Sequence, residues 1–202
     1  MAGMVAFAVT AVLAVTPKGI DLFGACVLGI ITACGGGTVR DVILGVPVFW
    51  SEDQNYLWVA LIASLVAFYG NRLVSRRDVY LLMLYIDGIG VSLFAIQAAH
   101  KVLALQFAVP FGPVVLGVIT AIGGGLIRDV LAGNTTLLMQ KELYAIPVTI
   151  GCVLYVLLFG WFPDEGNAIG VGCVLFTFAF RAAAIHWKLT VPGWMESRSR
   201  ET

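Results

Sequence analysis

The sequence predicts an all-helical membrane protein: seven transmembrane helices, built as an inverted repeat of three plus three helices with one extra C-terminal helix. Three observations predict this fold: the composition, the long apolar runs and an internal repeat. Of the 202 residues, 60% are hydrophobic and 12% are charged, and the mean hydropathy is +0.96. Soluble domains carry about 25% charged residues. The low charge therefore excludes a soluble globular domain, a disordered chain and a nucleic-acid-binding protein.

Seven apolar segments follow one another along the chain. Each is continuously apolar, whereas a barrel strand alternates over about ten residues. The first is a short span, and the others approach or exceed the roughly 20 residues that a transmembrane helix needs. The first segment lacks the basic start of a secretory signal, because its first cation, Lys18, follows the apolar stretch. The segments are 2–16, 21–47, 56–73, 79–99, 108–133, 143–162 and 167–187.

Basic residues in the connections predict the orientation. Counting alternate connections, eight Lys and Arg residues fall on one side of the membrane and Lys101 alone falls on the other. Because basic residues stay in the cytoplasm, we expect the N-terminus outside and the C-terminus inside. Arg181, within the last segment, is expected to reach the membrane surface or to pair within an oligomer. The eight are Lys18, Arg72, Arg76, Arg77, Lys141, Lys188, Arg198 and Arg200.

An internal repeat relates the second and fifth segments. Residues 24–45 read GACVLGIITACGGGTVRDVILG and residues 112–133 read GPVVLGVITAIGGGLIRDVLAG, with fourteen of 22 positions identical at an offset of 88. The register continues to Tyr56 and Tyr144. Since the matches include Gly, Arg and Asp as well as aliphatic residues, composition alone does not explain them.

The offset spans three helices, an odd number, so the second copy enters the membrane from the opposite side. Inverted repeats of this kind are a transport architecture with the solute path at the interface between the repeats; duplication that serves stability alone is the alternative. The whole chain, 1–202, forms one transmembrane domain. Its expected parts are repeat one at about 1–75, repeat two at about 79–163, span seven at about 167–187 and a cytoplasmic tail at 188–202.

A glycine triplet lies near the middle of each repeated helix, at Gly35-Gly36-Gly37 and at Gly123-Gly124-Gly125. Each helical glycine costs about 1 kcal/mol relative to alanine. We therefore expect these two helices to kink or unwind at the triplets and to offer backbone groups to a passing solute. The alternative is that small residues allow close helix packing.

Each triplet is followed by an Arg-Asp pair, Arg40-Asp41 and Arg128-Asp129. A charge at a helix centre costs about 2.5–3.5 kcal/mol on insertion scales, so such residues face a cavity or one another. Inverted symmetry suggests cross-repeat pairs, Arg40 with Asp129 and Arg128 with Asp41. Pairing of each arginine with the aspartate that follows it is the alternative. The sequence does not distinguish ion pairs that only join the helices from charged residues that contact the solute.

Other polar residues within the apolar segments are candidates for lining the path. Thr32 and Thr120 occupy equivalent positions of the repeat, and Asp87, Ser92 and Gln97 lie in the fourth segment. Asp87 lies near the start of its segment, where an interfacial position is the alternative.

The sequence contains no pattern typical of an enzyme or of a resident metal. It has no His-Glu-x-x-His, no Gly-x-Ser-x-Gly and no phosphate-binding loop, because GGGTVRD lacks the Gly-Lys-Ser/Thr ending. The four cysteines lie inside apolar runs without metal-ligand spacing. We expect no catalytic residue, no metal site and no cofactor.

The doubled motif, GGGTVRDVILG at 35–45 and GGGLIRDVLAG at 123–133, resembles the prokaryotic trimeric intracellular cation channel family. The same domain is also described as a glycine-transporter-like domain. The resemblance covers nearly the whole chain and implies a homotrimer with one pore in each protomer, kinked second and fifth helices, and a bacterial inner or plasma membrane. In animal members a basic lipid site follows the second-span glycines; Arg40 replaces its lysine here, which weakens the case for phosphoinositide binding.

The resemblance implies conduction of monovalent cations, mainly potassium, with weak selectivity. K⁺ or Na⁺ would be the permeant ion, membrane lipids are expected partners, and neither nucleotide nor nucleic acid is expected. No Thr-Val-Gly-Tyr-Gly filter is present, in agreement with weak selectivity. A secondary transporter for glycine or another small zwitterion is the alternative function, with a half-helix N-terminus holding the carboxylate.

Overall fold

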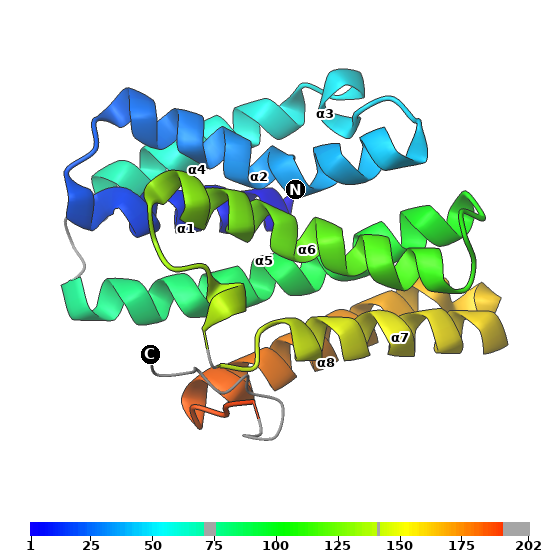
Figure 1. The fold of residues 1–202 in the computed structure, drawn as a ribbon. Helices are drawn as coiled ribbons and strands as arrows, with labels where there is room; N and C mark the ends of the chain where they lie inside the picture. Colours follow the sequence, from blue (N-terminus) through cyan, green and yellow to red (C-terminus); the bar gives the residue numbers. More distant parts are fainter. Residues whose placement is uncertain (71–75, 141, 192–202) are drawn as a thin grey trace, which may run out of the picture.

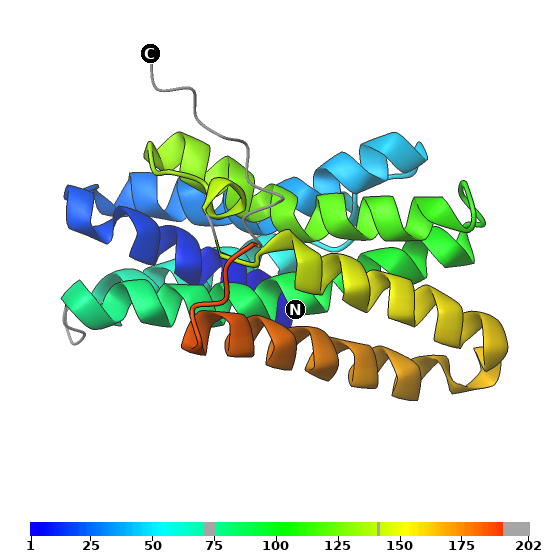
Figure 2. The same ribbon diagram turned by 60° about the horizontal axis from the view of Figure 1, so that its bottom comes forward.

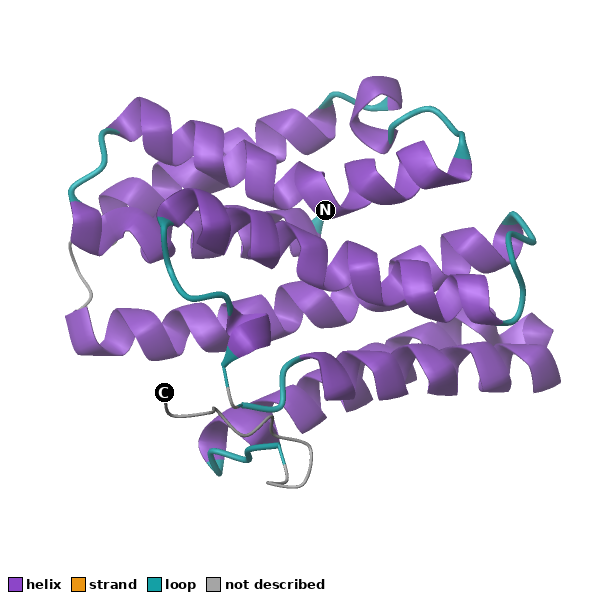
Figure 3. Cartoon of the chain, in the orientation of Figure 1, coloured by secondary structure: helices purple, strands orange, loops and turns teal. Residues whose placement is uncertain are grey.

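The computed structural model describes residues 1–70, 76–140 and 142–191, and these residues are almost entirely helical (Figure 3). Within these ranges the only β pairing is an isolated antiparallel bridge between Glu142 and Thr190. Some of the residues used to predict orientation, Arg72, Lys141, Arg198 and Arg200, lie outside the described residues.

The first three apolar segments form α1 (Ala2–Val15), α2 (Leu22–Leu44) and α4 (Asn55–Gly70). A 3₁₀ turn, η1 (Thr16–Lys18), follows α1, and the short helix α3 (Phe49–Glu52) follows α2. The sequence accounts for both ends of α2. At its start the side chain of Asp21 accepts a hydrogen bond from the Gly24 N–H, and at its end Gly45 adopts the left-handed conformation that glycine tolerates.

The next three apolar segments form α5 (Arg76–Ala104), α6 (Phe111–Ala132) and α7 (Ala145–Trp161). The 3₁₀ turns η3 (Leu137–Met139) and η4 (Pro163–Glu165) follow α6 and α7. The last segment forms α8 (Gly166–His186). The seven predicted spans therefore correspond one to one with α1, α2, α4, α5, α6, α7 and α8.

Four of these helices are long and apolar enough to cross a membrane: α2, α5, α6 and α8. The other three, α1, α4 and α7, are shorter apolar helices. At 1.5 Å per residue, the 29 residues of α5 extend about 44 Å, more than the hydrocarbon core of about 30 Å. The fold is therefore the predicted all-helical membrane fold.

Two helices, α1 and α5, form the centre of the bundle. α1 packs against α2, α4 and α5, and eleven of its 14 residues are buried. α5 packs against α1, α6, α7 and α8. The two repeats thus meet along α1 with α5 and along α2 with α6, as the ribbon shows (Figure 1).

The seventh span, α8, stands outside the repeat and packs on α5 and α7 along one edge of the bundle (Figure 2). Its Arg181 is fully buried, and its Nη1 donates a hydrogen bond of 3.0 Å to the Leu143 carbonyl. The prediction that Arg181 reaches the membrane surface or pairs within an oligomer is therefore wrong. The arginine instead joins α8 to the segment that precedes α7.

Candidate functional site

The two glycine triplets lie where α2 and α6 cross. A methyl group built on Gly36 would lie 2.1 Å from the Thr120 carbonyl oxygen, and one built on Gly124 would lie 2.5 Å from the Thr32 carbonyl oxygen. The two contacts are reciprocal, because each pair of equivalent residues is separated by the repeat offset of 88. The twofold axis that relates the inverted repeats therefore passes through this crossing.

Both helices remain helical through their triplets. α2 is one α-helix from Leu22 to Leu44, and α6 is one from Phe111 to Ala132. The prediction that the triplets unwind is wrong, and the alternative of close packing is what the structure contains. Missing side chains let the two backbones touch, and unbroken helices keep their backbone groups bonded within the membrane. The correction concerns unwinding only, since a helix can bend and stay α-helical.

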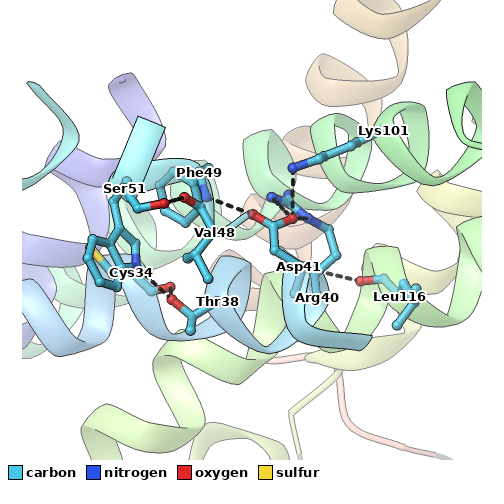
Figure 4. A network of polar contacts seen from close by, with 11 residues as sticks. Cys34, Thr38, Arg40, Asp41, Val48, Phe49, Ser51, Lys101 and Leu116 are labelled. Carbon is cyan, nitrogen blue, oxygen red and sulfur yellow. Dashed lines mark hydrogen bonds and ion pairs between the residues drawn. The ribbon is translucent and has the colours of Figure 1, made fainter. Parts of the chain in front are cut away.

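A charged cluster, here called the Asp41 cluster, follows the first triplet (Figure 4). Both Nε and Nη2 of Arg40 lie 2.8 Å from Oδ1 of Asp41. The Nζ of Lys101, from α5, lies 2.8 Å from the same oxygen. Asp41 is fully buried, whereas the Lys101 side chain is 33% exposed. One buried carboxylate therefore pairs with two cations, and one of them, Lys101, is partly exposed.

A second cluster, the Asp129 cluster, follows the second triplet. Nε of Arg128 donates to Oδ1 of Asp129 at 2.8 Å, and its Nη1 donates to Oδ1 of Asp87, on α5, also at 2.8 Å. The side chains of Arg128 and Asp87 are fully buried, and that of Asp129 is 4% exposed. Here one buried cation bridges two carboxylates.

The two aspartates play the same local role in each repeat. Oδ2 of Asp41 accepts a hydrogen bond from the Phe49 N–H at 3.0 Å, and Oδ2 of Asp129 accepts one from the Leu137 N–H at 3.2 Å. The donors are again 88 residues apart. Each carboxylate therefore fixes the turn that leaves its glycine helix, which explains why an aspartate occurs at this point of both repeats.

The cross-repeat pairs suggested by symmetry, Arg40 with Asp129 and Arg128 with Asp41, are wrong. Each arginine pairs with the aspartate that follows it in sequence. The physical reason is reach: the Arg side chain folds back over one peptide unit, and α5 supplies the third member of both clusters, Lys101 in one and Asp87 in the other. The formal charge sums to +1 in the Asp41 cluster (Arg40, Lys101, Asp41) and to −1 in the Asp129 cluster (Arg128, Asp87, Asp129).

The Asp129 cluster extends toward α8. The guanidinium of Arg181 lies 4.8 Å from the ring centroid of Tyr144. Polar side-chain atoms of Asp87, Arg128, Tyr144 and Arg181 are buried without a hydrogen-bond partner among the described residues. Buried polar atoms without a hydrogen bond raise the free-energy cost of burying a network. The ion pairs and the packing of the surrounding side chains must therefore offset that cost at this end of the protein.

Two cavities adjoin the clusters at opposite ends of α5. The first, the Lys101 cavity, has a volume of about 220 Å³ and is lined by Gly37, Arg40, Phe94, Gln97 and Lys101, among others. The second, the Lys18 cavity, has a volume of about 330 Å³, and its lining includes Lys18, Tyr80, Asp129, Asn134 and Gln140. Each can hold several waters, because one water needs about 15 Å³ by this measure.

The two cavities share no lining residue, and packed side chains separate them. The ring of Phe7, 1% exposed, stacks on that of Phe94 with centroids 5.4 Å apart. A methyl group on Gly124 would lie 3.9 Å from the Phe7 ring. The aromatic pair and the α2–α6 crossing therefore form one barrier near the centre of the bundle.

The predicted polar candidates divide into three groups. Gln97 lines the Lys101 cavity. Asp87 is fully buried against Arg128 rather than interfacial, and Ser92 is fully buried and donates to the Gly88 carbonyl at 2.7 Å. Thr32 and Thr120 are buried, each 1% exposed, at the α2–α6 crossing.

Sequence reasoning missed two lysines that join the repeats. Nζ of Lys18, at the end of α1, donates to the Ala132 and Gly133 carbonyls at the end of α6, the latter at 3.3 Å. Lys101, at the end of α5, reaches Asp41 at the end of α2. Each lysine from one repeat thus binds the end of the other repeat's glycine helix. The sequence offered no signal, because the two lysines are 83 rather than 88 residues apart.

Comparisons with known proteins agree on one family. The family model described as "Glycine transporter" matches residues 1–72 and 84–159. A "UPF0126 membrane protein" of Vibrio cholerae is 37% identical over 193 residues, covering 95% of this chain and 80% of that protein. The "UPF0126 inner membrane protein YadS" of Escherichia coli K12 is 35% identical over 191 residues, covering 94% and 91%.

Solved structures give the same result. The trimeric intracellular cation (TRIC) channel orthologue from Rhodobacter sphaeroides superposes with a TM-score of 0.86 at 32% identity, covering 93% of this chain and 95% of that one. A prokaryotic TRIC channel crystallised in 0.5 M KCl superposes with a TM-score of 0.86 at 27% identity, covering 94% and 95%.

Proposed function

Because this chain belongs to the glycine transporter family, to which the prokaryotic trimeric intracellular cation channels also belong, we propose that it conducts monovalent cations through a path inside each protomer. The path runs from the Lys101 cavity to the Lys18 cavity across the α2–α6 crossing. The observation that carries the proposal is the placement of these two cavities. They lie at opposite ends of α5, and each is lined by a residue of one charged cluster, Arg40 in the first and Asp129 in the second.

Cation passage requires that the arginines near the path do not repel the ion. Arg40 and Arg128 are each paired with a neighbouring carboxylate at 2.8 Å, and Arg128 is paired with two. Pairing at this distance largely cancels the field of the guanidinium beyond its immediate surroundings. Asp129 lines the Lys18 cavity and supplies a carboxylate for an entering cation. The local pairing therefore removes the objection that an intramembrane arginine would exclude K⁺.

The path is closed at the Phe7–Phe94 pair and the α2–α6 crossing. We propose that opening is a small displacement of α2 against α6 that unstacks the two rings and joins the cavities. The ion keeps part of its hydration, because neither cavity offers the ring of backbone carbonyls of a potassium-selective filter. Potassium preference over sodium would then be weak.

A homotrimer in a bacterial inner membrane, with the N-terminus outside, completes the proposal. The solved relatives described as trimeric channels and the inner membrane protein YadS support it. Mass measurement of the protein in lipid nanodiscs tests the oligomer. Labelling of single cysteines introduced at either end tests the orientation.

The deciding experiment is electrical recording of the purified protein in planar bilayers. The proposal predicts discrete single-channel currents, with reversal potentials in KCl and NaCl gradients that give cation over anion selectivity and a small K⁺/Na⁺ preference. Phe94→Ala should raise the fraction of time the channel is open, because it removes one ring of the barrier. Ile89→Ala, an exposed residue on α5 that lines neither cavity of the path, is the matched control. Absence of current in both the native protein and the Phe94→Ala variant would rule out the proposal.

The family description "Glycine transporter" gives the second candidate function, a carrier for glycine or another small zwitterion. That mechanism was expected to use a broken helix whose free N-terminus binds the carboxylate. Neither α2 nor α6 offers such an end, because both are uninterrupted. Saturable uptake of labelled glycine into proteoliposomes, in the absence of channel currents, would establish the carrier instead.

A further inference from the structure

A third cavity lies between α5, α7 and α8, outside the proposed ion path. We call it the α5–α8 cavity. Its volume of about 420 Å³ exceeds those of the Lys18 and Lys101 cavities. Ligand sites in proteins span about 300–1,000 Å³, with mostly apolar walls and a few placed polar groups. The α5–α8 cavity fits this description, and the conduction mechanism makes no use of it.

The polar groups of the cavity come from all three helices. Nδ1 of His100 on α5 lies 2.8 Å from the hydroxyl of Tyr155 on α7, and Tyr155 is 1% exposed. The side-chain amides of Gln97 on α5 and Asn167 on α8 also line the cavity. Neither amide makes a hydrogen bond to any residue that the structure describes. The site therefore holds a fixed polar pair and two amide groups free to bind a ligand.

The remaining walls are apolar and uncharged. Ile96, Val174 and Leu175 are among the lining side chains, and no Lys, Arg, Asp or Glu contributes. The cavity depends on a glycine. A methyl group on Gly170 would lie 3.8 Å from Cε2 of Tyr155 and 4.0 Å from Cγ2 of Ile96. A larger side chain at position 170 would therefore extend into the cavity without clashing at its base.

The cavity is beside the least covered long helix. Only 28% of the most apolar window of α8 is buried, against 44–56% in the other three long helices. Val171 and Leu175, which line the cavity from α8, are 62% and 61% exposed. In a membrane-spanning chain, exposed apolar side chains of this kind face lipid. Lipids of the surrounding bilayer therefore have direct access to the cavity.

We propose that the α5–α8 cavity binds a membrane lipid by its glycerol ester region and the first part of one acyl chain. The ester carbonyls accept hydrogen bonds from the Gln97 and Asn167 amides, and the chain lies along Ile96 and Val174. Because no charged residue lines the site, recognition depends on the ester groups and the chain rather than on a charged headgroup. Gln97 also lines the Lys101 cavity, so the bound lipid would share a wall with the ion path.

The test uses the full chain in nanodiscs that contain phosphatidylcholine with a photoreactive diazirine near the glycerol end of one acyl chain. After irradiation, peptide mass spectrometry should find adducts on the residues of α5, α7 and α8 that line the cavity. Gly170→Leu fills the cavity and should lower these adducts about tenfold. Gly172→Leu is the matched control, because a side chain there meets nothing within 4 Å; it should leave the adducts within about twofold.

Three further experiments test the ester contact, a second blocked variant and the identity of the occupant. An unlabelled ester lipid should compete better than the ether lipid of the same chain length; equal competition would overturn the ester contact. Leu175→Trp, at the exposed rim, blocks the mouth without altering the base and replaces Gly170→Leu if that variant does not fold. Adducts that are absent from the native protein, or unchanged in the blocked variants, would overturn the site. A protomer-to-protomer product from a photoreactive amino acid at Val171 would identify a second copy of the chain as the occupant and also overturn it. None of these outcomes depends on ion conduction.

Discussion

The Asp41 cluster and the Asp129 cluster occupy equivalent positions of the two repeats, yet they differ in charge and in burial. The first has two cations on one carboxylate, and one of them, Lys101, is 33% exposed. The second has one cation between two carboxylates, and both Arg128 and Asp87 are fully buried. The two repeats thus share the aspartate and its turn, whereas α5, a helix of the second repeat, supplies a different partner to each cluster: Lys101 to Asp41 across the repeats and Asp87 to Arg128 within its own repeat.

This difference indicates a division of labour between the two ends of the protein. Removing one member of a buried ion pair leaves an uncompensated charge, so the Asp129 cluster has little freedom to rearrange. Lys101 can move into its cavity, because its ammonium is carried by a flexible side chain that is partly exposed. We therefore expect the Asp129 end to hold the fold and the Asp41 end to change during gating.

The largest expected effect separates the two arginines. Arg128→Met should lower the free energy of unfolding by about 3–5 kcal/mol, because it leaves Asp87 and Asp129 buried without a cation. Arg40→Met should cost much less, because Lys101 and the Phe49 N–H remain on Asp41. Thermal unfolding of both variants in detergent, followed by the loss of helical circular dichroism, measures the difference. Equal losses of stability would contradict the proposed division of labour.

The next effect tests what the repeats share. Gly36→Ala and Gly124→Ala each place a methyl group within 2.5 Å of a carbonyl oxygen across the α2–α6 crossing. Each should cost about 1–3 kcal/mol, because the helices must move apart. Gly123→Ala is the control, since its nearest atom would be 3.4 Å away, and its higher helix propensity should offset most of the strain. If all three variants unfold at the same temperature, the close crossing is not what the glycines provide.

A smaller effect concerns conduction at the Asp41 end. Lys101→Met changes the formal charge of the Asp41 cluster from +1 to 0 and should raise the single-channel K⁺ conductance by about two- to threefold at low salt. The increase should disappear near 1 M KCl, where the Debye length falls to about 3 Å. Lys101→Arg, which keeps the charge, serves as the control. A Lys101→Met increase that persists at high salt would point to removal of a steric block instead.

The smallest effect concerns the glycines that end α2 and α6. Gly45 has φ of +67° and Gly133 has φ of +62°. Replacing either by alanine should cost about 1 kcal/mol, since a left-handed conformation is unfavourable for a residue with a Cβ. The two costs should be equal, because the turns are equivalent. Urea unfolding of the two variants would detect an inequality, which would mean that the Lys18 contact at the second turn matters as well.

Much of the fold could be predicted from particular residues. The seven apolar runs matched seven apolar helices, four long and three shorter, because the length of an apolar run reflects how much chain a bilayer requires. The Gly and Arg-Asp matches at an offset of 88 predicted the repeat, and the reciprocal contacts of Gly36 with Thr120 and of Gly124 with Thr32 follow from it. Family membership followed from the same motif.

The site was less predictable. Symmetry suggested that Arg40 would pair with Asp129, but a side-chain pairing depends on distances of a few ångströms that sequence does not contain. The low helix propensity of glycine predicted that the glycine triplets would break their helices. The structure has intact helices instead, because the absence of side chains there is used for contact between backbones.

The sequence by itself determined the membrane environment, the seven apolar helices, the inverted repeat and the position of the charged pairs within it. These properties depend on hydrophobicity and on the spacing of residues, and both follow directly from the order of residues in the chain. Only the tertiary structure decided that Lys101 and Asp87 complete the two clusters, that Phe7 stacks on Phe94, and that Arg181 is buried. Those contacts join helices far apart in sequence, so side-chain reach and packing in three dimensions select them.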